Sequence, residues 1–386
     1  MRSSVSSPSA PRLVDDPTQL AAMLERLGAA DEIAVDCESD GLHHWRGRLC
    51  TAQFAVPDGE LWIVDALAVP VAPALAAVLG PDGPRKVLHD LYLDAWLLRD
   101  AGLTLGNVAD TSVHARFLGL RETGLAALLG ARLGVPLDKA FQQHDWSLRP
   151  LAPEHAAYLA DDVRHLLALH ALLDAEARAL GIDDAVREET GYALRRAVSD
   201  AENARPTYAR LKGRQTLDAL GRAALRRLAD ARETVARTRD LPVGRVLPNA
   251  ALVELARRRP TSLGRLRALV HGGLHDDATL VAWRDAIVAG TADGDVPPDE
   301  RGWFEVPRCP FDPLTRRRRE QALQRWRAAV ATERGVDPQA VLPGHCVEAL
   351  AAIEARAAED LVDIDGLGAL RIERDGAALL ACLQTV

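Results

Sequence analysis

Two carboxylates stand at the end of a short apolar run, where they could hold a cation. The run is Ile33-Ala34-Val35, and Asp36 and Glu38 follow it at positions i and i+2. A short apolar run is typical of a buried strand, and residues two apart on a strand point to the same side. Like charges side by side are tolerated when a cation, usually a metal, lies between them. A solvated strand end is the alternative, and this pair alone does not decide between the two.

A third carboxylate, Asp94, lies in an otherwise largely apolar helix predicted over residues 91–98. A buried carboxylate is costly unless it is paired or binds a metal, so Asp94 is the next candidate ligand. The alternative is a helix edge that faces solvent. A short strand at 86–88 precedes this helix, and because Asp90 comes just after that strand, we expect Asp90 to cap the helix.

A tyrosine and an aspartate lie one helical turn apart further along the chain. Tyr158 and Asp162 occupy positions i and i+4 of a helix that Pro153-Glu154 opens, so their side chains share one face. Asp161 points about 100° away around the helix axis and is expected to face solvent. Such a pair is ordinarily only a hydrogen-bonding pair, so its meaning depends on the three carboxylates.

The elements that position these side chains include both strands and helices. An amphipathic helix is predicted at 18–28, before the Asp36 strand, and Pro57-Asp58-Gly59 is expected to turn a hairpin. The region 107–178 is expected to be mainly helical, with Asp110 as a helix cap. The remaining predicted elements are strands at 48–56 and 60–64 and helices at 71–79, 111–118 and 125–133.

Composition limits the class of protein. The chain of 386 residues is 48% hydrophobic, enough for two or three domains with real cores. It has no apolar run of membrane-spanning length, and residues 1–10 are expected to form a disordered tail rather than a signal peptide. The five cysteines are scattered, which favours reduced thiols and a cytoplasmic protein. No P-loop is present, so no nucleotide cofactor is expected.

The net charge of −8 is unevenly distributed. Residues 1–205 are acidic, whereas residues 206–290 hold twice as many Lys and Arg side chains as Asp and Glu side chains. An acidic domain joined to a basic one fits metal-binding carboxylates next to a phosphate-binding surface. An arginine-rich solvated helix face explains the basic segment almost equally well.

Together, the three motifs resemble those of a known family of nucleases. Their order resembles that of the DEDDy-type 3′–5′ exonucleases, and specifically ribonuclease D: Asp36 and Glu38 match the first motif, Asp94 the second, and Tyr158 with Asp162 the third. The resemblance implies a ribonuclease H-like exonuclease domain, an α/β fold with a mixed sheet flanked by helices.

Flanking residues extend the resemblance and show one departure from it. His89 stands five residues before Asp94, and the run 145–151 looks like the segment that precedes the third motif in similar proteins. Relatives often place a bulky aromatic residue directly after the Glu, where it stacks on the terminal base. Here that residue is Ser39, and His43, His44 or Trp45 is the expected alternative stacking surface.

The C-terminal half looks like two copies of the small helical HRDC domain (helicase-and-RNase-D C-terminal domain). Val246-Leu247-Pro248-Asn249 recurs 95 residues later as Val341-Leu342-Pro343-Gly344, and Asn249 is expected to cap a helix. The predicted organisation is a tail at 1–10, an exonuclease domain at 11–205, a first HRDC domain at 206–290, a linker at 291–313 and a second HRDC-like domain at 314–386.

The implied activity is 3′–5′ exoribonuclease action by two-metal hydrolysis, releasing 5′-monophosphates. The four carboxylates would bind two Mg²⁺ or Mn²⁺ ions, hard cations that prefer oxygen ligands, and Tyr158 would position the attacking water. The alternatives are a DNA-directed exonuclease and an inactive nucleic-acid-binding scaffold. Expected nucleic-acid contacts are His89, Trp45, Arg149, Arg226, Arg227, Arg257, Arg258 and Arg259.

The implied partner is RNA with a free 3′ end, and the family implies tRNA precursors or other structured RNA. We expect a monomer that makes no membrane contact.

Overall fold

The computed structural model describes residues 10–199, 206–305 and 309–384. It divides into two compact units. The first contains the described residues up to Ser39, then 49–198 and the C-terminal segment from Cys309. The second contains residues 40–48 and the segment from Ser199 to Arg308, apart from its undescribed residues. Most of the predicted tail at 1–10, and the predicted boundary at residue 205, lie outside the described residues.

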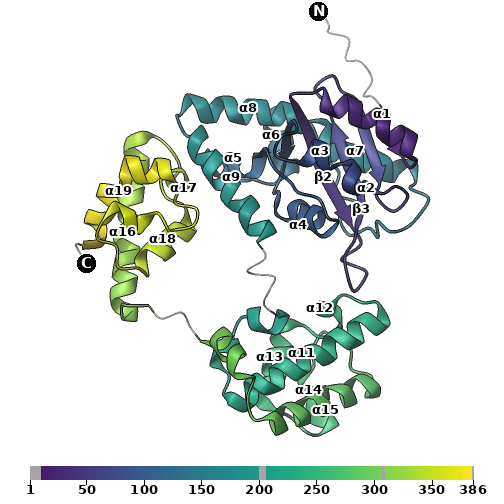
Figure 1. The fold of residues 1–386 in the computed structure, drawn as a ribbon, viewed down its shortest axis with the longest axis vertical. Helices are drawn as coiled ribbons and strands as arrows, with labels where there is room; N and C mark the ends of the chain where they lie inside the picture. The colour runs from purple at the N-terminus through teal and green to yellow at the C-terminus, as the bar shows by residue number, and fades with distance from the viewer. Residues whose placement is uncertain (1–9, 200–205, 306–308, 385–386) are drawn as a thin grey trace, which may run out of the picture. The chain divides into compact units, whose positions relative to one another are not determined.

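A six-stranded mixed sheet is the centre of the first unit (Figure 1). The strands follow the spatial order β1-β4-β3-β2-β5-β6. β2, β3 and β4 are antiparallel neighbours, while β5 and β6 continue parallel to β2. The hairpin and the short strand after it were predicted; β1 and β6, with three residues each, are too short for a sequence pattern. The strands are β1 (Arg12–Val14), β2 (Glu32–Ser39), β3 (Leu49–Ala55), β4 (Leu61–Asp65), β5 (Arg85–Leu88) and β6 (Val108–Asp110).

Helices cover both faces of this sheet. They are α1 (Pro17–Gly28), α2 (Val71–Ala74), α3 (Ala76–Leu79), α4 (Tyr92–Asp100), α5 (Thr111–Phe117), α6 (Leu125–Leu133), α7 (Pro153–Arg164), α8 (Leu166–Ala179) and α9 (Asp183–Val198). The predicted helices at 18–28 and 125–133 are confirmed, and Asp110 caps α5 as expected by accepting hydrogen bonds from two amides of its first turn.

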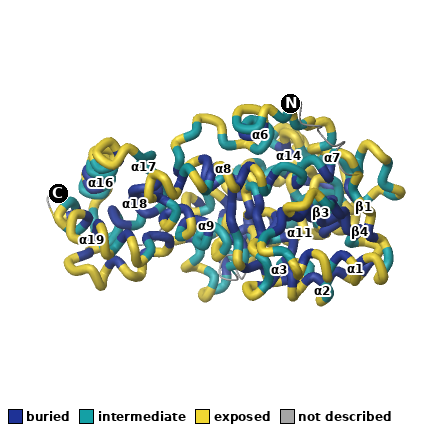
Figure 2. Tube along the Cα trace, turned by 90° about the horizontal axis from the view of Figure 1, so that it is seen from above, coloured by how far each residue is buried: buried dark blue, intermediate teal, exposed yellow. Residues whose placement is uncertain are grey.

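Alternation along β2 assigns its side chains to the two faces. Ile33 and Val35 join the apolar core that α1 and α4 complete, whereas Ala34 packs with α7 and α8 on the other face. Asp36 and Glu38 continue the series of Ala34, because residues two apart share a side. The central strand β3 is buried along its whole length (Figure 2), so the sheet is a rigid support for the side chains at its ends.

The second unit is helical. A core around Leu225, Leu228 and Trp283 joins α11 to α15. Gly290 lets these two helices approach closely, since a Cβ atom there would lie 2.6 Å from the Cα of Ala224. The elements are η1 (Thr207–Arg210), η2 (Arg214–Thr216), α11 (Ala219–Arg239), α12 (Val243–Val246), α13 (Asn249–Arg258), α14 (Leu263–Leu269), α15 (Asp277–Asp293) and the 3₁₀ helix η3 (Pro298–Phe304).

Two expectations for this segment are wrong. Residues 291–305 of the predicted linker are folded: α15 runs to Asp293, and Phe304 of η3 is buried in the core. Its many Pro, Asp and Gly residues suggested a linker, but Val296 and Phe304 supply apolar anchors. Asn249 is the first residue of α13 instead of its cap, and its side chain accepts a hydrogen bond from Arg232.

The C-terminal segment repeats this arrangement. Its elements are α16 (Pro313–Arg334), α17 (Pro338–Val341), α18 (Gly344–Ala351), η4 (Ala358–Leu361) and α19 (Ala369–Gln384). Arg232 of α11 donates to the carbonyl of Leu247 at 3.0 Å, and Arg327 of α16 donates to the carbonyl of Leu342 at 3.0 Å. Arg327 and Leu342 lie 95 residues after Arg232 and Leu247, the same offset as in the sequence repeat. The repeat in the sequence is therefore also a repeat in the structure.

The C-terminal helical segment packs on α9 within the first unit. Arg371 is 1% exposed and forms an ion pair with Glu188 at 3.0 Å. His345 stacks on Tyr192 with ring centroids 4.0 Å apart. The turn at Gly366-Leu367-Gly368 makes room for α9, because a Cβ atom at Gly368 would lie 2.2 Å from the Glu188 carboxylate.

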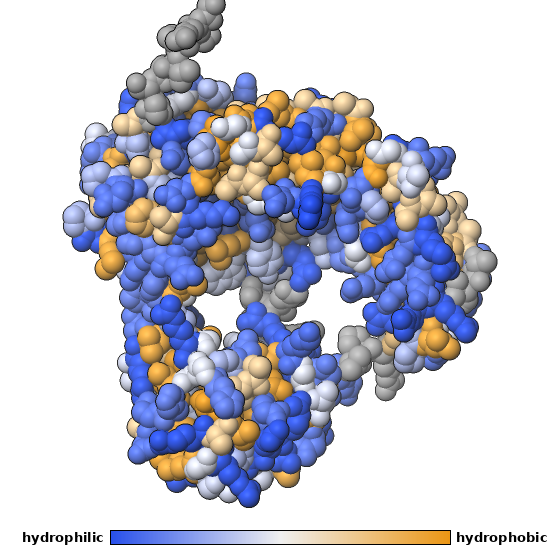
Figure 3. Space-filling model, turned by 180° about the vertical axis from the view of Figure 1, so that it is seen from behind, coloured by the Kyte–Doolittle hydropathy of each residue, from blue (hydrophilic) through white to orange (hydrophobic). Residues whose placement is uncertain are grey.

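The surface mixes hydrophilic residues with smaller hydrophobic groups, as the face drawn in Figure 3 shows. Exposed large apolar side chains include Leu93, Leu148 and Leu314. Within the described part of the chain, no helix combines the length and the apolar character needed to cross a membrane.

Removing the buried cation of the α9 contact is expected to destabilise the first unit. Arg371→Ala leaves Glu188 without its partner, and breaking a buried pair costs about 3–5 kcal/mol. The matched control is Arg195→Ala on α9, whose ion pair with Asp365 is exposed on both sides and contributes about 0–1 kcal/mol. Urea unfolding midpoints measure both effects, and equal shifts for the two variants would contradict a structural role for the buried pair.

Candidate active site

The end of β2 presents the first two carboxylates. Asp36 pairs with Gln53 of β3 in the sheet register, and Glu38 pairs with Thr51. The register shifts directly after Glu38. A bulge of this kind bends a strand and re-aims its side chains, and bulges are common next to active sites. The predicted shared face of Asp36 and Glu38 therefore lies at the point where β2 leaves the sheet.

Asp94 reaches this strand end from α4, and the residue is only 6% exposed. The expectation that Asp90 caps α4 is wrong. Asp90 has a φ of 61°, and the carboxylate of Asp110 accepts hydrogen bonds from the amides of Asp90 and Leu91 at 3.1 and 2.9 Å. Asp110 comes from β6, so a tertiary contact takes the place of the local cap.

Helix α7 brings the third motif to the same place. Tyr158 and Asp162 lie on its face toward the sheet, and the neighbouring residues Leu159 and Val163 are buried. Asp161 points away as predicted and pairs with Arg164 at 2.8 Å, with half of its side chain exposed.

The motifs meet in one cleft of about 370 Å³. Ligand oxygens of Asp36, Glu38 and Asp162 lie within 4.8 Å of one another. Asp94 is not among the cleft-lining residues, but it lies close enough for its charge to act on Asp36. The lining residues are Asp36, Glu38, His89, Leu125, Gln142, Tyr158, Asp162 and Leu166.

Burial raises the pKa of every carboxylate in this group. Burial raises the pKa of Asp36 well above its ordinary value, and the charges of Asp94, Asp162 and Glu38 raise it further. Burial, followed by the charges of Asp162 and Asp94, raises the pKa of Glu38 to about 8. The pKa of Asp94 rises to about 8 and that of Asp162 to about 7, in both cases chiefly through burial.

This electrostatic state fits a divalent cation. Four carboxylates that repel one another in a poorly solvated cleft are stabilised in their charged forms when cations lie between them. All ligand atoms of the group at Asp36 are carboxylate oxygens, the type that Mg²⁺ and Mn²⁺ prefer. Asp36, Glu38 and Asp162 can hold such an ion directly, with Asp94 beside them.

Gln53 is a supporting residue that the sequence analysis missed. It is fully buried, and the amide orientation that satisfies its surroundings directs its NH₂ to Asp36, 2.7 Å from the carbonyl oxygen and 3.2 Å from the carboxylate. Its amide oxygen then accepts from the Thr51 hydroxyl at 2.7 Å. The available signal was a lone glutamine in the apolar strand segment 50–56.

Aromatic side chains form the wall behind Tyr158. Trp146 stacks on Tyr158 with ring centroids 5.8 Å apart, and Phe141 meets the same ring edge-on at 5.7 Å. Trp146 is 1% exposed. This packing fixes the tyrosine ring, so that its hydroxyl is carried into the cleft by a rigid support.

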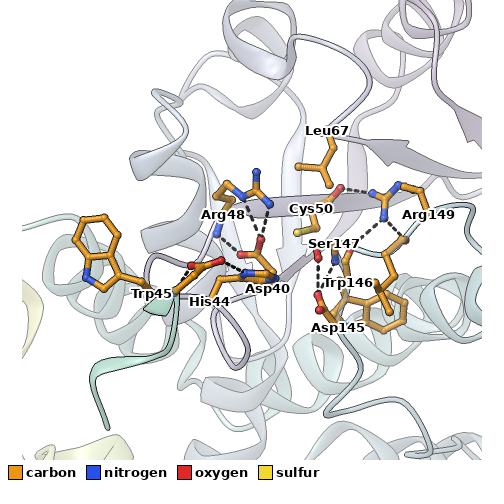
Figure 4. A network of polar contacts seen from close by, with 12 residues as sticks. Asp40, His44, Trp45, Arg48, Cys50, Leu67, Asp145, Trp146, Ser147 and Arg149 are labelled. Atoms are coloured by element: carbon orange, nitrogen blue, oxygen red, sulfur yellow. Dashed lines mark hydrogen bonds and ion pairs between the residues drawn. The ribbon is translucent and has the colours of Figure 1, made fainter. Parts of the chain in front are cut away.

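Arg149 was predicted to contact nucleic acid. In the structure it holds the segment that carries Trp146 (Figure 4). Its guanidinium pairs with Asp65 at 2.6 and 2.8 Å and donates to the carbonyl oxygens of Trp146, Leu148 and Cys50. A guanidinium has five N–H donors, and these contacts use all five. Arg149 is therefore a structural clamp between β3, β4 and the loop before α7.

Trp45, predicted as a base-stacking residue, is engaged within the second unit. Its indole N–H donates to Glu233 at 2.8 Å, and its backbone N–H donates to Asp240 at 3.1 Å. The guanidinium groups of Arg46 and Arg237 lie over its ring, 5.1 and 5.8 Å from the centroid. The indole that was predicted to stack on a base is therefore already in contact with residues of the second unit.

The arginines predicted to gather RNA form ion pairs inside the second unit. Arg226 pairs with Glu300, Arg227 with Asp293, Arg257 and Arg258 with Glu254, and Arg259 with Asp218. Each of these five arginines thus has an acidic partner in the fold. Exposed pairs of this kind contribute only about 0–1 kcal/mol, so a phosphate can compete for these side chains.

Family models match both halves of the chain. One described as a 3′-5′ exonuclease matches residues 11–177, and one described as an HRDC domain matches residues 221–274 and 316–383. The exonuclease match contains all five residues of the three motifs, and the HRDC matches lie within the two predicted C-terminal domains.

Curated relatives agree with these models. Ribonuclease D of Zymomonas mobilis is 32% identical over 270 residues, which cover 67% of each chain. Protein RRP6-like 2 of Arabidopsis thaliana is 30% identical over 275 residues, 67% of this chain but 31% of the relative. The chain matches less than half the length of the two Arabidopsis relatives.

A solved structure shows the same fold. The crystal structure of Escherichia coli RNase D, described as an exoribonuclease involved in structured RNA processing, superposes with a TM-score of 0.75. It is 24% identical, and the match covers 98% of this chain and 99% of that chain.

Neutralising Asp162 is expected to remove the response of the fold to a divalent cation. Mg²⁺ or Mn²⁺ at about 100 times its Kd stabilises a protein by about 2.7 kcal/mol, and the resulting rise in Tm should be lost in Asp162→Asn. Without metal, the variant should unfold at the same temperature or higher, since one repelling charge is gone.

Asp161→Asn is the control, because Asp161 lies on the same helix but faces Arg164. Thermal unfolding with and without the metal measures both variants. A full metal-induced rise in Asp162→Asn would rule out this aspartate as a ligand.

Proposed function

Because this chain belongs to the ribonuclease D family, we propose that it is a 3′–5′ exoribonuclease that removes nucleotides one at a time from RNA 3′ ends. The convergence of Asp36, Glu38, Asp94 and Asp162, with Tyr158, at the end of β2 is the observation that carries this proposal. The products are 5′-monophosphates, and the substrates are tRNA precursors or other structured RNA acted on by a monomer.

The cofactors in this proposal are two divalent cations, Mg²⁺ or Mn²⁺, held by the four carboxylates. When bound, they balance the four negative charges and supply Lewis acidity at the scissile phosphate. Gln53 holds Asp36 through its amide, and α4 carries the buried Asp94 close to Asp36. The carboxylates are thus positioned before any substrate arrives, which lowers the cost of assembling the reactive geometry.

Tyr158 acts as a positioning group for the attacking water. Burial raises the pKa of its hydroxyl, and the charges of Asp162 and Glu38 raise it further, so the hydroxyl keeps its proton at neutral pH. A protonated phenol donates one hydrogen bond and accepts another, but it does not remove a proton. Its role is to orient a water against the terminal phosphate.

His89 supplies a hydrogen-bond acceptor for the sugar in this proposal. Its Nδ1 lies 2.8 Å from the hydroxyl of Thr111, which itself donates to the carbonyl of Leu88 at 3.1 Å. A carbonyl only accepts, so the Thr111 proton is used there and the hydroxyl accepts from Nδ1–H. Nε2 is then an acceptor on a ring that lines the cleft, and burial lowers the pKa of His89, which keeps the ring neutral.

The decisive assay is release of mononucleotides from the 3′ end of labelled RNA and of single-stranded DNA. We expect Mg²⁺- or Mn²⁺-dependent release that favours RNA, and its loss in Asp94→Asn. The matched control is Asp90→Asn, which should stay active because Asn readily adopts the positive φ of that exposed position. Faster release from DNA would favour a DNA-directed exonuclease, and no release from either would favour a binding scaffold.

Tyr158→Phe should slow the reaction without affecting metal binding. The substitution removes a water-positioning hydroxyl, for which a loss of about 10²–10⁴-fold in kcat is expected by comparison with general acid–base groups. Calorimetric titration with Mn²⁺ should give the wild-type affinity. Lost metal binding in this variant would contradict the assigned role.

His89→Ala should lower kcat/KM for substrates that carry the sugar hydroxyl. One hydrogen bond is worth about 0.5–1.5 kcal/mol, so kcat/KM on RNA should fall about 3- to 10-fold. RNA that ends in a 2′-deoxy or a 3′-deoxynucleotide shows which hydroxyl is contacted. On the RNA that lacks this hydroxyl, the kcat/KM values of the variant and the wild type should differ less. An equal loss on all three substrates would exclude a sugar contact.

A further inference from the structure

A second group of metal-binding side chains lies outside the carboxylate cleft. One nitrogen of His114, one nitrogen of His170 and an oxygen of Asp174 lie within 4.8 Å of one another. His114 comes from α5, while His170 and Asp174 are one turn apart on α8. The histidines are 4% and 3% exposed, so their rings occupy fixed positions in the protein interior.

The ring orientation of His114 is set by the backbone. Its Nδ1 lies 2.8 Å from the carbonyl oxygen of Asp110, which can only accept, so the ring proton is on Nδ1. The lone pair of Nε2 then faces the Asp174 carboxylate, whose Oδ1 is 3.7 Å away. Metal-binding histidines characteristically donate their other N–H to a carbonyl or carboxylate in this way.

Asp174 is oriented by a separate contact. Arg178 holds its Oδ2 at 2.7 Å, which leaves Oδ1 as the oxygen toward His114. The distance of 3.7 Å between that oxygen and Nε2 is close to the spacing of two ligands that each lie about 2.0–2.2 Å from one zinc ion.

His170 completes the group in its neutral form. The two imidazole rings meet edge-on with centroids 5.2 Å apart. A neutral imidazole is the form that binds metals. The Glu32 carboxylate lies 3.6 Å from Nδ1 of His170 and adds negative charge on that side.

The group opens into a cavity of about 420 Å³, separate from the cleft at Asp36. Polar side chains such as Asn107 and Thr190 also line this cavity, so water can complete a coordination shell. Arg85 and Arg178 also line the cavity, and their positive charges oppose a second cation. This set of nitrogen and oxygen ligands suits one ion.

We propose that His114, His170 and Asp174 bind a single first-row transition-metal ion of the zinc type. Two imidazoles and one carboxylate favour such an ion over Mg²⁺, which prefers oxygen ligands alone. The ion links α5 to α8. It also braces Asp110, whose carbonyl orients His114 and whose carboxylate holds the start of α4.

The test uses metal-free full-length protein carrying Asp162→Asn, so that zinc binding at the carboxylate cleft is reduced. Titration with ZnCl₂ in excess MgCl₂ should give one site by calorimetry and a higher Tm. CoCl₂ in place of zinc should give a visible absorption band from nitrogen coordination.

His114→Gln and His170→Gln should each weaken zinc binding at least about tenfold and abolish the cobalt band. His271→Gln, on the exposed surface of the second unit, is the matched control and should behave like the parent. If a histidine variant fails to fold, Asp174→Asn provides the same comparison at a partly exposed, isosteric position. Unchanged zinc affinity in the folded variants, or no binding by the parent protein, would overturn the proposal.

Discussion

Repulsion among the carboxylates at the end of β2 is the constraint on which the rest of the exonuclease fold depends. Asp36, Glu38, Asp94 and Asp162 come from two layers of helices and the sheet between them, and burial raises the pKa of each. Such a group does not assemble through its own interactions, because every approach of one charge to another is unfavourable without a cation. The apolar layers on both faces of the sheet supply the free energy that holds it together.

The supporting residues are themselves polar and fully engaged. Gln53 holds Asp36, Asp110 holds the start of α4, and Arg149 holds the segment that carries Trp146. Each makes several directed hydrogen bonds from a buried or half-buried position, where an unsatisfied donor would cost about 1–3 kcal/mol. These residues therefore specify one geometry for the cleft, in addition to stabilising the fold.

The helical modules show how a charge count can mislead. The basic segment 206–290 appears suited to a polyanion, yet its clustered arginines pair with acidic residues that are distant in sequence, such as Asp293 and Glu300. In the C-terminal module, Arg371 is buried against Glu188 and serves packing on α9. A polyanion that approaches these arginines must therefore compete with the carboxylates already paired with them, and salt weakens both kinds of interaction.

The sequence by itself determined the parts that depend on local spacing: the shared face of Asp36 and Glu38, the helical turn between Tyr158 and Asp162, the helices at 18–28 and 125–133 and the 95-residue repeat. Strand and helix periodicity fixes which side chains share a face, whatever the rest of the chain does. Only the tertiary structure decided that Asp110 and not Asp90 holds α4, that Arg149 and Trp45 have structural partners, and that His114 meets His170 and Asp174. These outcomes join residues far apart in the chain, and no local pattern encodes which distant donor will meet which acceptor.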